Sequence, residues 1–172
     1  MREIETKRLR LRPLAPEDRD ALFVIYADPE VSRYLLAQPR SIEEFRQPFQ
    51  KMVELSSTLG MWVVISKADN HMIGRCGFYP FSEERTPELA YLLSRAYWGA
   101  GFATEAARSC LEYAFSEQGW AEVVAMVRPE NRASARVLAK VGMKRLRTIR
   151  VRGNTMELYR LRSPHADRAS RE

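Results

Sequence analysis

Residues 97–106, YWGAGFATEA, place two glycines and a threonine between an apolar run and a helical pattern. A turn of this kind leaves several main-chain N–H groups pointing one way, at the positive end of the helix that follows. Gly99 and Gly101 permit left-handed backbone angles and close approach of an anion, and Thr104 adds a hydroxyl. The segment therefore has the composition of a phosphate-binding turn, although a plain strand-to-helix connection uses glycines in the same way.

Three kinds of phosphate site compete for this turn. A Walker loop requires Gly-Lys-Ser/Thr after four intervening residues, and no lysine stands near Gly101. A dinucleotide fingerprint requires a third glycine where Thr104 stands, within a parallel βαβ unit. The third pattern, Gln/Arg-x-x-Gly-x-Gly/Ala, cradles the pyrophosphate of coenzyme A, and here Gly101 and Ala103 match it while Trp98 departs from it.

The first sixty residues predict one strand and three helices. Alternating leucines and arginines indicate a strand over 9–13 with one exposed face. Asp28 is a good N-cap, Ser41 and Glu44 form a capping box, and Pro48 should bend or shorten the helix that contains it. The expected helices cover 16–26, 29–35 and 41–60.

The remaining residues predict a sheet interrupted by helices. MWVVISK, MIGRCGFY and ELAYLLS are β-rich runs with short connections, which indicates an antiparallel meander. After the glycine turn, apolar residues recur at spacings of three and four and leave Glu105 for solvent. A strand, a capped helix and two basic strands with a turn at RGNT follow. The order predicts a single mixed-sheet α+β domain over 1–162 and a polar tail over 163–172.

Length and composition fit one globular domain. The chain has 172 residues, 45% of them hydrophobic, and no apolar run near the roughly 18 residues of a membrane helix. Its first residues show no secretory signal, so we expect a cytoplasmic protein with no membrane partner. Cys76 and Cys110 stand far apart and are expected to be buried, reduced thiols. Because the histidines are only His71 and His165, we expect no metal site and no histidine triad.

The net charge of +6 is carried by the stretch 143–162, which contains seven Lys or Arg and one acid, Glu157. A basic strand pair can steer an anionic partner, and it can equally be a solvated outer face. The charges come without interleaved aromatic residues or a recognition-helix pattern, so nucleic acid is not the expected partner.

YWGAGFATEA, with ELAYLLS before it and NRASARVLAKVGM after it, resembles the Gcn5-related N-acetyltransferase (GNAT) superfamily. The opening TKRLRLRPLAPEDRDALFVIYADPEVSRYL resembles its branch of ribosomal-protein N-terminal acetyltransferases, so the likeness spans residues 6–162. It implies a mixed, mostly antiparallel sheet of about seven strands flanked by about four helices and splayed between the fourth and fifth strands. It also implies a monomer or homodimer that uses acetyl-CoA and no metal.

The resemblance assigns the coenzyme site residue by residue. Trp98 stands where the broad superfamily has Gln or Arg, as it does in this branch, so main-chain donors would hold the phosphates. Asn131 matches the asparagine that contacts the coenzyme arm after the fifth strand. Pantetheine would pair like an added strand with the main chain of Tyr91, Leu92 and Leu93. The pyrophosphate turn would comprise Trp98, Gly99, Ala100, Gly101, Phe102 and Ala103, with Thr104 opening the helix.

The implied reaction is direct attack of a neutral amine on the thioester of acetyl-CoA in a ternary complex. Glu88 matches the family glutamate near the acceptor and is the candidate base, acting through water; the alternative is a surface glutamate that opens a strand. Glu105 is the second candidate, although its place on the polar helix face favours a solvated side chain. A main-chain N–H near Leu93 is the expected oxyanion donor.

The superfamily tyrosine that acts as an acid, seven residues after the asparagine, is replaced by Leu138. Ser134 on the same helix would contact the sulfur and relay a proton, and the alternative is that it only packs the helix. An acid is also dispensable, because a thiol with a pKa of about 8.5 leaves near neutral pH with modest help. Aromatic residues of the early helices wall the acceptor pocket in this family, and Tyr34 is expected to line it, with core packing as the alternative.

Amine pKa values favour one acceptor class. At pH 7 a lysine-like amine with a pKa of about 10.4 costs roughly 4–5 kcal/mol to deprotonate, whereas a protein α-amine near 7.7–8.0 costs about 1. We therefore expect the N-terminus of a protein or peptide as acceptor, with acidic ones suiting the basic strands better than polyamines. The alternatives are a small amine (amino acid, polyamine or antibiotic), a non-catalytic acyl-CoA-binding module and a dinucleotide-dependent oxidoreductase.

Overall fold

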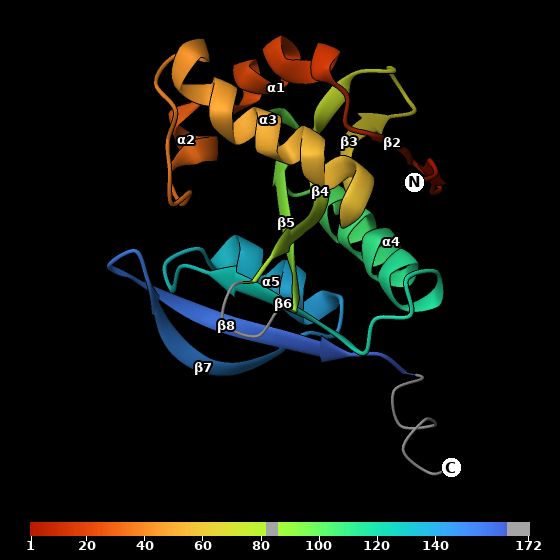
Figure 1. Cartoon of the computed structure of the whole chain (residues 1–172), viewed down its shortest axis with the longest axis vertical. Helices are drawn as coiled ribbons and strands as arrows, with labels where there is room; N and C mark the ends of the chain where they lie inside the picture. Colours follow the sequence, from red (N-terminus) through yellow and green to blue (C-terminus); the bar gives the residue numbers. More distant parts are fainter. Residues whose placement is uncertain (82–85, 165–172) are drawn as a thin grey trace.

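Eight strands form one sheet in the computed structural model, which describes residues 1–81 and 86–164. Along the sheet their order is β1-β2-β3-β4-β5-β6-β8-β7 (Figure 1). Neighbours are antiparallel except β5 and β6, which are parallel. The strands are β1 Ile4–Glu5, β2 Leu9–Pro13, β3 Met61–Ser66, β4 Met72–Pro80, β5 Pro87–Leu93, β6 Glu122–Val127, β7 Lys144–Val151 and β8 Asn154–Arg162. The predicted mixed α+β sheet is confirmed, with β1 as a strand that the sequence pattern did not announce.

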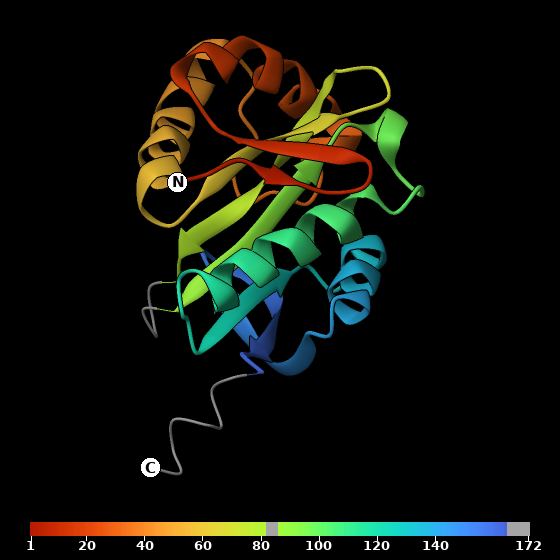
Figure 2. The same cartoon turned by 90° about the vertical axis from the view of Figure 1, so that its right-hand side faces the viewer.

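Within the described residues, five α-helices cover the two faces of the sheet (Figures 1 and 2). The first three lie over one face, and the last two lie over the other. In the part of the chain that the structure describes, none of them is long and apolar enough to cross a membrane. The helices are α1 Arg19–Tyr26, α2 Pro29–Ser32, α3 Ile42–Thr58, α4 Phe102–Ser116 and α5 Arg132–Lys140, with short 3-10 helices η1 Pro16–Asp18 and η2 Arg95–Tyr97.

The early helices follow their predicted starts more closely than their predicted ends. Asp28 caps α2 by accepting from the Glu30 N–H at 2.9 Å, but α2 ends at Ser32 rather than at residue 35. Ser41 caps α3 as expected. Of the two effects expected of Pro48, a bend or a shorter helix, shortening does not occur, because the helix runs for 17 residues through it. A proline removes only one helical hydrogen bond, and the buried face of α3 holds the helix on the sheet.

The apolar runs of the central strands are buried on both faces, which explains why they do not alternate with polar residues. On the α4 side, Trp62 and Phe78 lie in a core with the helix. On the opposite side, Val63 lies in a second core with Phe45 of α3. The two cysteines are buried and free, as expected from their spacing.

The sheet opens between β5 and β6. The two parallel strands share a single registered pair, Glu88 with Val124. Beyond this pair β5 stays with β4, whereas β6 continues with β8, and in Figure 1 the β6–β8–β7 part lies nearly across the direction of β4 and β5. We call the opening between β5 and β6 the wedge. It corresponds to the splay expected between the fourth and fifth strands of the family fold, since β1 is an additional strand here. The predicted tail 163–172 lies outside the described residues from 165 onward, while the Ser163 N–H donates to the Ala121 carbonyl at 2.8 Å.

Candidate active site

The glycine turn adopts the conformation that its composition predicts. Gly99 and Gly101 have φ values of 78° and 84°, in the left-handed region. Gly101 is the N-cap of α4 and offers no side chain to cap the helix. The first helical hydrogen bond runs from the Glu105 N–H to the Gly101 carbonyl, and among the described residues no acceptor serves the N–H groups of 99–104. The turn therefore presents unpaired donors at a helix N-terminus, which fits the diphosphate of a coenzyme.

Three side chains hold this turn from outside. The Trp98 indole N–H donates to the Leu93 carbonyl at 2.8 Å. The Tyr97 hydroxyl donates to Asp69 at 2.6 Å, and this bond, with others from Ser66 and His71, lowers the Asp69 pKa to about 2. On the far side, Arg8 donates to the Ala100 carbonyl at 2.8 Å. Trp98 thus braces the turn against β5, and the donors are held in place before any ligand arrives.

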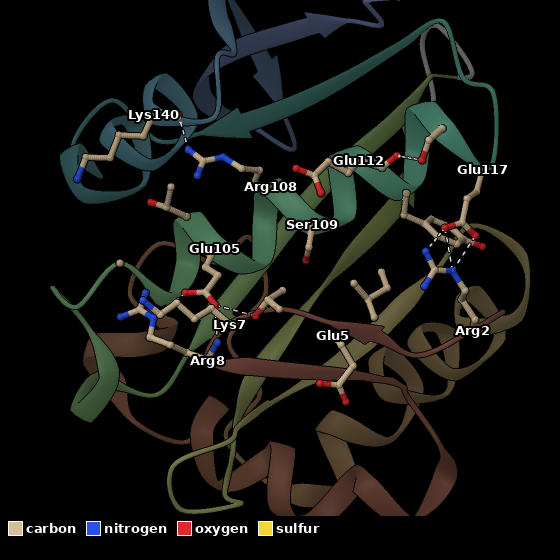
Figure 3. A pocket seen from close by; sticks show the side chains of 16 residues that line it. Arg2, Glu5, Lys7, Arg8, Glu105, Arg108, Ser109, Glu112, Glu117 and Lys140 are labelled. Carbon is tan, nitrogen blue, oxygen red and sulfur yellow. Dashed lines mark hydrogen bonds and ion pairs between the residues drawn. The ribbon is translucent and has the colours of Figure 1, made fainter.

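Arg8 also explains the position of Glu105, which is not the solvated side chain that the helical pattern suggested. The Glu105 carboxylate accepts from the Thr6 hydroxyl at 2.7 Å, from the Arg8 N–H at 2.9 Å and from the Arg8 Nε at 2.7 Å (Figure 3). Partial burial opposes ionisation, but the bonds from Thr6 and Arg8 prevail and lower the Glu105 pKa. Glu105 therefore joins β2 to α4 and is a poor base. The Arg8 guanidinium also lies 4.3 Å from the centre of the Phe102 ring.

A groove of about 620 Å³ runs along the outer face of α4, between the β1–β2 hairpin and the end of α5 (Figure 3). The groove begins at Gly101 and Thr104. Arg108 and Lys140 lie above it, with Arg108 donating to the Lys140 carbonyl at 3.3 Å. The groove does not contain Glu88. The lining of the groove carries both basic and acidic side chains, and Arg8 is paired with Glu105.

Glu88 stands where the wedge begins. It pairs with Tyr79 of β4 on one side and with Val124 of β6 on the other. Burial raises the Glu88 pKa to about 7, although the Arg75 charge works in the opposite direction. Glu88 also lines a separate hollow of about 250 Å³. A half-buried carboxylate with this pKa, open to a cavity, can accept a proton near neutral pH.

Arg75 is a buried cation that sequence reasoning missed. Its exposed fraction is 5%, and its Nε donates to the Tyr26 hydroxyl at 2.7 Å. The guanidinium lies 5.3 Å from the centre of the Tyr79 ring, and its Nη1 has no hydrogen-bond partner in the described structure. Alternation along β4 places Arg75 and Tyr79 on one face of the sheet. The only signal in the sequence was a charged residue inside the apolar run MIGRCGFY.

Ser134 meets a tyrosine hydroxyl across the wedge. The Tyr91 hydroxyl lies 2.8 Å from Ser134 Oγ, and either oxygen can donate. Burial raises the Tyr91 pKa, so the hydroxyl keeps its proton. Asn131 caps α5 by accepting from the Ser134 N–H at 3.1 Å, while Leu138 is buried in the core. The sequence assigned only the main chain of Tyr91 to the site, and the structure places its phenol hydroxyl beside Ser134.

The main chain of β5 divides between its two neighbours. The Ser94 N–H donates to the Ile73 carbonyl of β4 at 2.7 Å. Alternation then turns the main chain of Leu92 towards β4 and those of Tyr91 and Leu93 towards the open wedge. Of the three residues predicted to pair with pantetheine, Leu92 is thus engaged within the sheet. The Leu93 carbonyl accepts from the Trp98 indole N–H, and the Leu93 N–H faces the wedge, so its role as an oxyanion donor stays a prediction.

Tyr34 lies beside the end of β6 rather than in the hollow of Glu88. Its carbonyl accepts from Arg128 Nε at 3.2 Å, and the Arg33 guanidinium lies 5.5 Å from the centre of its ring. Tyr34 does not line the hollow that contains Glu88, so its contact with an acceptor stays a prediction. Within the described ranges, no group of three or more His, Cys, Asp or Glu is placed to hold a metal.

Comparisons with known proteins agree with this geometry. Residues 8–144 match the family described as "Acetyltransferase (GNAT) domain". The uncharacterized N-acetyltransferase p20 of Bacillus licheniformis is 30% identical, over 92% of this chain and 94% of the relative. The FsC-acetyl coenzyme A-N(2)-transacetylase of Aspergillus fumigatus is also 30% identical, over 84% of this chain and 66% of the relative. A solved GNAT acetyltransferase from Bacillus anthracis superposes with a TM-score of 0.81 at 26% identity, covering 94% of this chain and 98% of its own.

The family match spans the glycine turn, the wedge and Glu88 together. The unpaired main-chain donors suit the diphosphate of coenzyme A, and a carboxylate with a pKa of about 7 suits an amine acceptor. The chain therefore belongs to the GNAT family of acetyl-CoA-dependent N-acetyltransferases.

Proposed function

We propose that the enzyme acetylates the α-amine at the N-terminus of a protein or peptide. The observation that carries this proposal is the Glu88 pKa of about 7. Proton transfer to Glu88 costs about 1 kcal/mol from an α-ammonium with a pKa of 7.7–8.0, but roughly 5 kcal/mol from a lysine-like ammonium with a pKa of about 10.4. The resemblance of the first thirty residues to the ribosomal-protein N-terminal acetyltransferases supports the same acceptor.

Residues that line the wedge carry out each step of the reaction. Glu88 takes the ammonium proton through a water molecule, and the neutral nitrogen then attacks the acyl carbon. The Leu93 N–H donates to the oxygen on which negative charge develops. As the carbon–sulfur bond breaks, the Tyr91–Ser134 hydroxyl pair gives a proton to the leaving sulfur. The nitrogen of the adduct loses its second proton to water, and solvent returns a proton to the hydroxyl pair. The products are an N-acetylated chain and free coenzyme A. Acetyl-CoA supplies only the activated acyl group.

The glycine turn and Asn131 position the coenzyme for this attack. The N–H groups of 99–104 would hold the diphosphate, with Arg8 beside them at the Ala100 carbonyl. Asn131 uses its Oδ1 to cap α5, which leaves its amide N–H groups for the coenzyme arm. These contacts lie at the helix N-terminus and at the mouth of the wedge, so they orient the thioester towards Glu88.

An acceptor panel tests the proposed function directly. Release of free thiol from acetyl-CoA is followed with peptides of free and blocked N-terminus, spermidine, free amino acids and an aminoglycoside, with spontaneous hydrolysis subtracted. We expect the highest kcat/KM for peptides with a free α-amine, because their pKa matches Glu88. A higher kcat/KM for the polyamine or the aminoglycoside would contradict the proposal. Coenzyme binding without any turnover would indicate a non-catalytic acyl-CoA-binding module.

Substituting Glu88→Gln removes the base and keeps the shape of the side chain. Wild-type kcat/KM should rise with pH through about 7, because Glu88 is protonated below its pKa and can accept a proton only above it. The variant should lose this rise and about 100-fold or more of kcat/KM at neutral pH, while the KM for acetyl-CoA stays unchanged. Its Tm at pH 8 should not fall, since the half-buried carboxylate destabilises the fold once ionised. An unchanged pH profile would exclude Glu88 as the base.

Substituting Gly101→Ala tests the coenzyme turn. Gly101 has a φ of 84°, where an alanine is strained by roughly 1–2 kcal/mol, so relaxation should redirect the N–H donors. We expect the KM for acetyl-CoA to rise about 10-fold or more, since each hydrogen bond to a charged group contributes roughly 1.5–3 kcal/mol. Gly119→Ala is the matched control, because Gly119 has a φ of 64° at the other end of α4. Equal effects on coenzyme KM would contradict the assignment.

Substituting Tyr91→Phe or Ser134→Ala tests the hydroxyl pair. Because the two oxygens share one hydrogen bond, either change should lower kcat by about 10-fold, and the double variant should be no worse than the poorer single variant. Coenzyme affinity, measured by titration with coenzyme A, should hold in Tyr91→Phe. If the two losses multiply, the residues act separately; if kcat is unchanged, the thiolate leaves without their help.

A further inference from the structure

The hollow beside Glu88 is closed by the tip of the β7–β8 hairpin. Its lining includes Glu88 of β5, Met126 of β6 and the consecutive residues Arg150, Val151 and Arg152. At about 250 Å³ it falls below the roughly 300–1,000 Å³ of a pocket for a complete small ligand. A space of this size suits the end of a chain, with the rest of the acceptor outside.

The backbone of the hairpin tip is strained at one of these residues. Arg152 and Gly153 form the two central positions of the turn between Val151 and Asn154, with φ values of 49° and 78°. Two-residue hairpins with positive φ at both positions ordinarily use Asn, Asp or Gly at the first. A long side chain is disfavoured in this left-handed backbone conformation. Because Arg152 also lines the hollow of Glu88, the strained residue lies where the acceptor must enter.

Among the described residues that line this entrance, the exposed charges are positive. Arg150 and Arg152 are exposed, and Arg150 Nη1 donates to the Gly153 carbonyl at 3.3 Å, which leaves its other donors available. Glu88 is the one acidic side chain in the lining of this hollow as described, and the reaction needs it as a base. Arg75 adds a buried cation, and its charge acts to lower the Glu88 pKa. A polyamine would bring further positive charge into this field, whereas a carboxylate would be attracted.

We propose that Arg150 and Arg152 select acceptors that carry a carboxylate a few bonds from the acetylated amine, as does a chain whose first residue is Asp or Glu. The inference rests on the proposed function, since it assumes that the α-amine enters at Glu88. With the amine at the base, a side-chain carboxylate of the first residue faces the hairpin tip and pairs with the guanidinium groups. Free amino acids share this chemistry through their α-carboxylate, and the experiment separates the two sources.

The experiment compares hexapeptides that differ only at their first residue, Asp against Asn and Glu against Gln. Wild-type enzyme should show a kcat/KM ratio of about 10 or more in favour of the acidic member of each pair, because a charge-assisted hydrogen bond is worth roughly that factor. The ratio should shrink as salt is raised, since the arginines are exposed. Free aspartate and free alanine form the second arm.

The variant Arg152→Asn places in the turn a residue that accepts positive φ, so the fold is kept or stabilised. Its ratio of kcat/KM for acidic over amide peptides should fall towards 1. Adding Arg150→Gln to this variant should lower the ratio further. Lys144→Gln is the matched control: it removes the same charge from the other end of β7, outside the hollow, and should keep the wild-type ratio.

The outcomes separate this inference from the proposed function. A wild-type enzyme that acetylates Asn and Asp peptides equally keeps the proposed function and overturns charge selection. Equal loss of the ratio in Lys144→Gln and Arg152→Asn also overturns it, because the effect is then the net charge of the protein rather than the hollow. Acetylation of free aspartate in preference to alanine, with no peptide accepted, overturns the N-terminal acceptor and supports charge selection by the hairpin.

Discussion

The parting of β5 from β6 is the constraint on which the rest of the site depends. Two parallel strands in the middle of a sheet that share only the Glu88–Val124 pair leave main-chain groups without a neighbouring strand. Such groups need partners, because an unpaired buried N–H or C=O is costly. Trp98 satisfies one of them at the Leu93 carbonyl, and the Tyr91–Ser134 bond spans the gap. The remaining main-chain groups make the wedge a place for an extended ligand arm.

The glycine turn that follows β5 also leaves main-chain groups without partners. Its donors are unpaired because Gly101 begins α4 without a capping side chain, and an uncapped helix end is less stable than a capped one. The protein offsets this with bonds from segments far away in the sequence, namely Arg8 of the β1–β2 hairpin and Asp69 of the β3–β4 turn. These bonds hold the turn in place, and its glycines adopt the left-handed backbone angles without steric cost.

Local patterns in the sequence predicted what local physics determines. The meander, the glycine turn and the caps of α2 and α3 follow from periodicity and from side chains that bond their own helix ends. Features set by distant partners escaped prediction. Glu105 has a polar helix position, yet Arg8 lies 97 residues away and binds it. In the sequence, Tyr91 is one residue of an apolar strand. Its hydroxyl lies beside Ser134 only because the fold places α5 next to this tyrosine.

The positive charge of the C-terminal strands lies at two separate places, and the proposed selection of acidic acceptors concerns only one of them. β7 is an edge strand whose exposed basic residues discourage pairing with another chain. At the hairpin tip the same kind of residue lies beside the base. There it has opposing effects, since a cation attracts an acidic acceptor but also lowers the pKa of the carboxylate that must take its proton. Burial raises the Glu88 pKa to about 7 against the opposing charge of Arg75, so one hollow can combine cationic recognition with a working base.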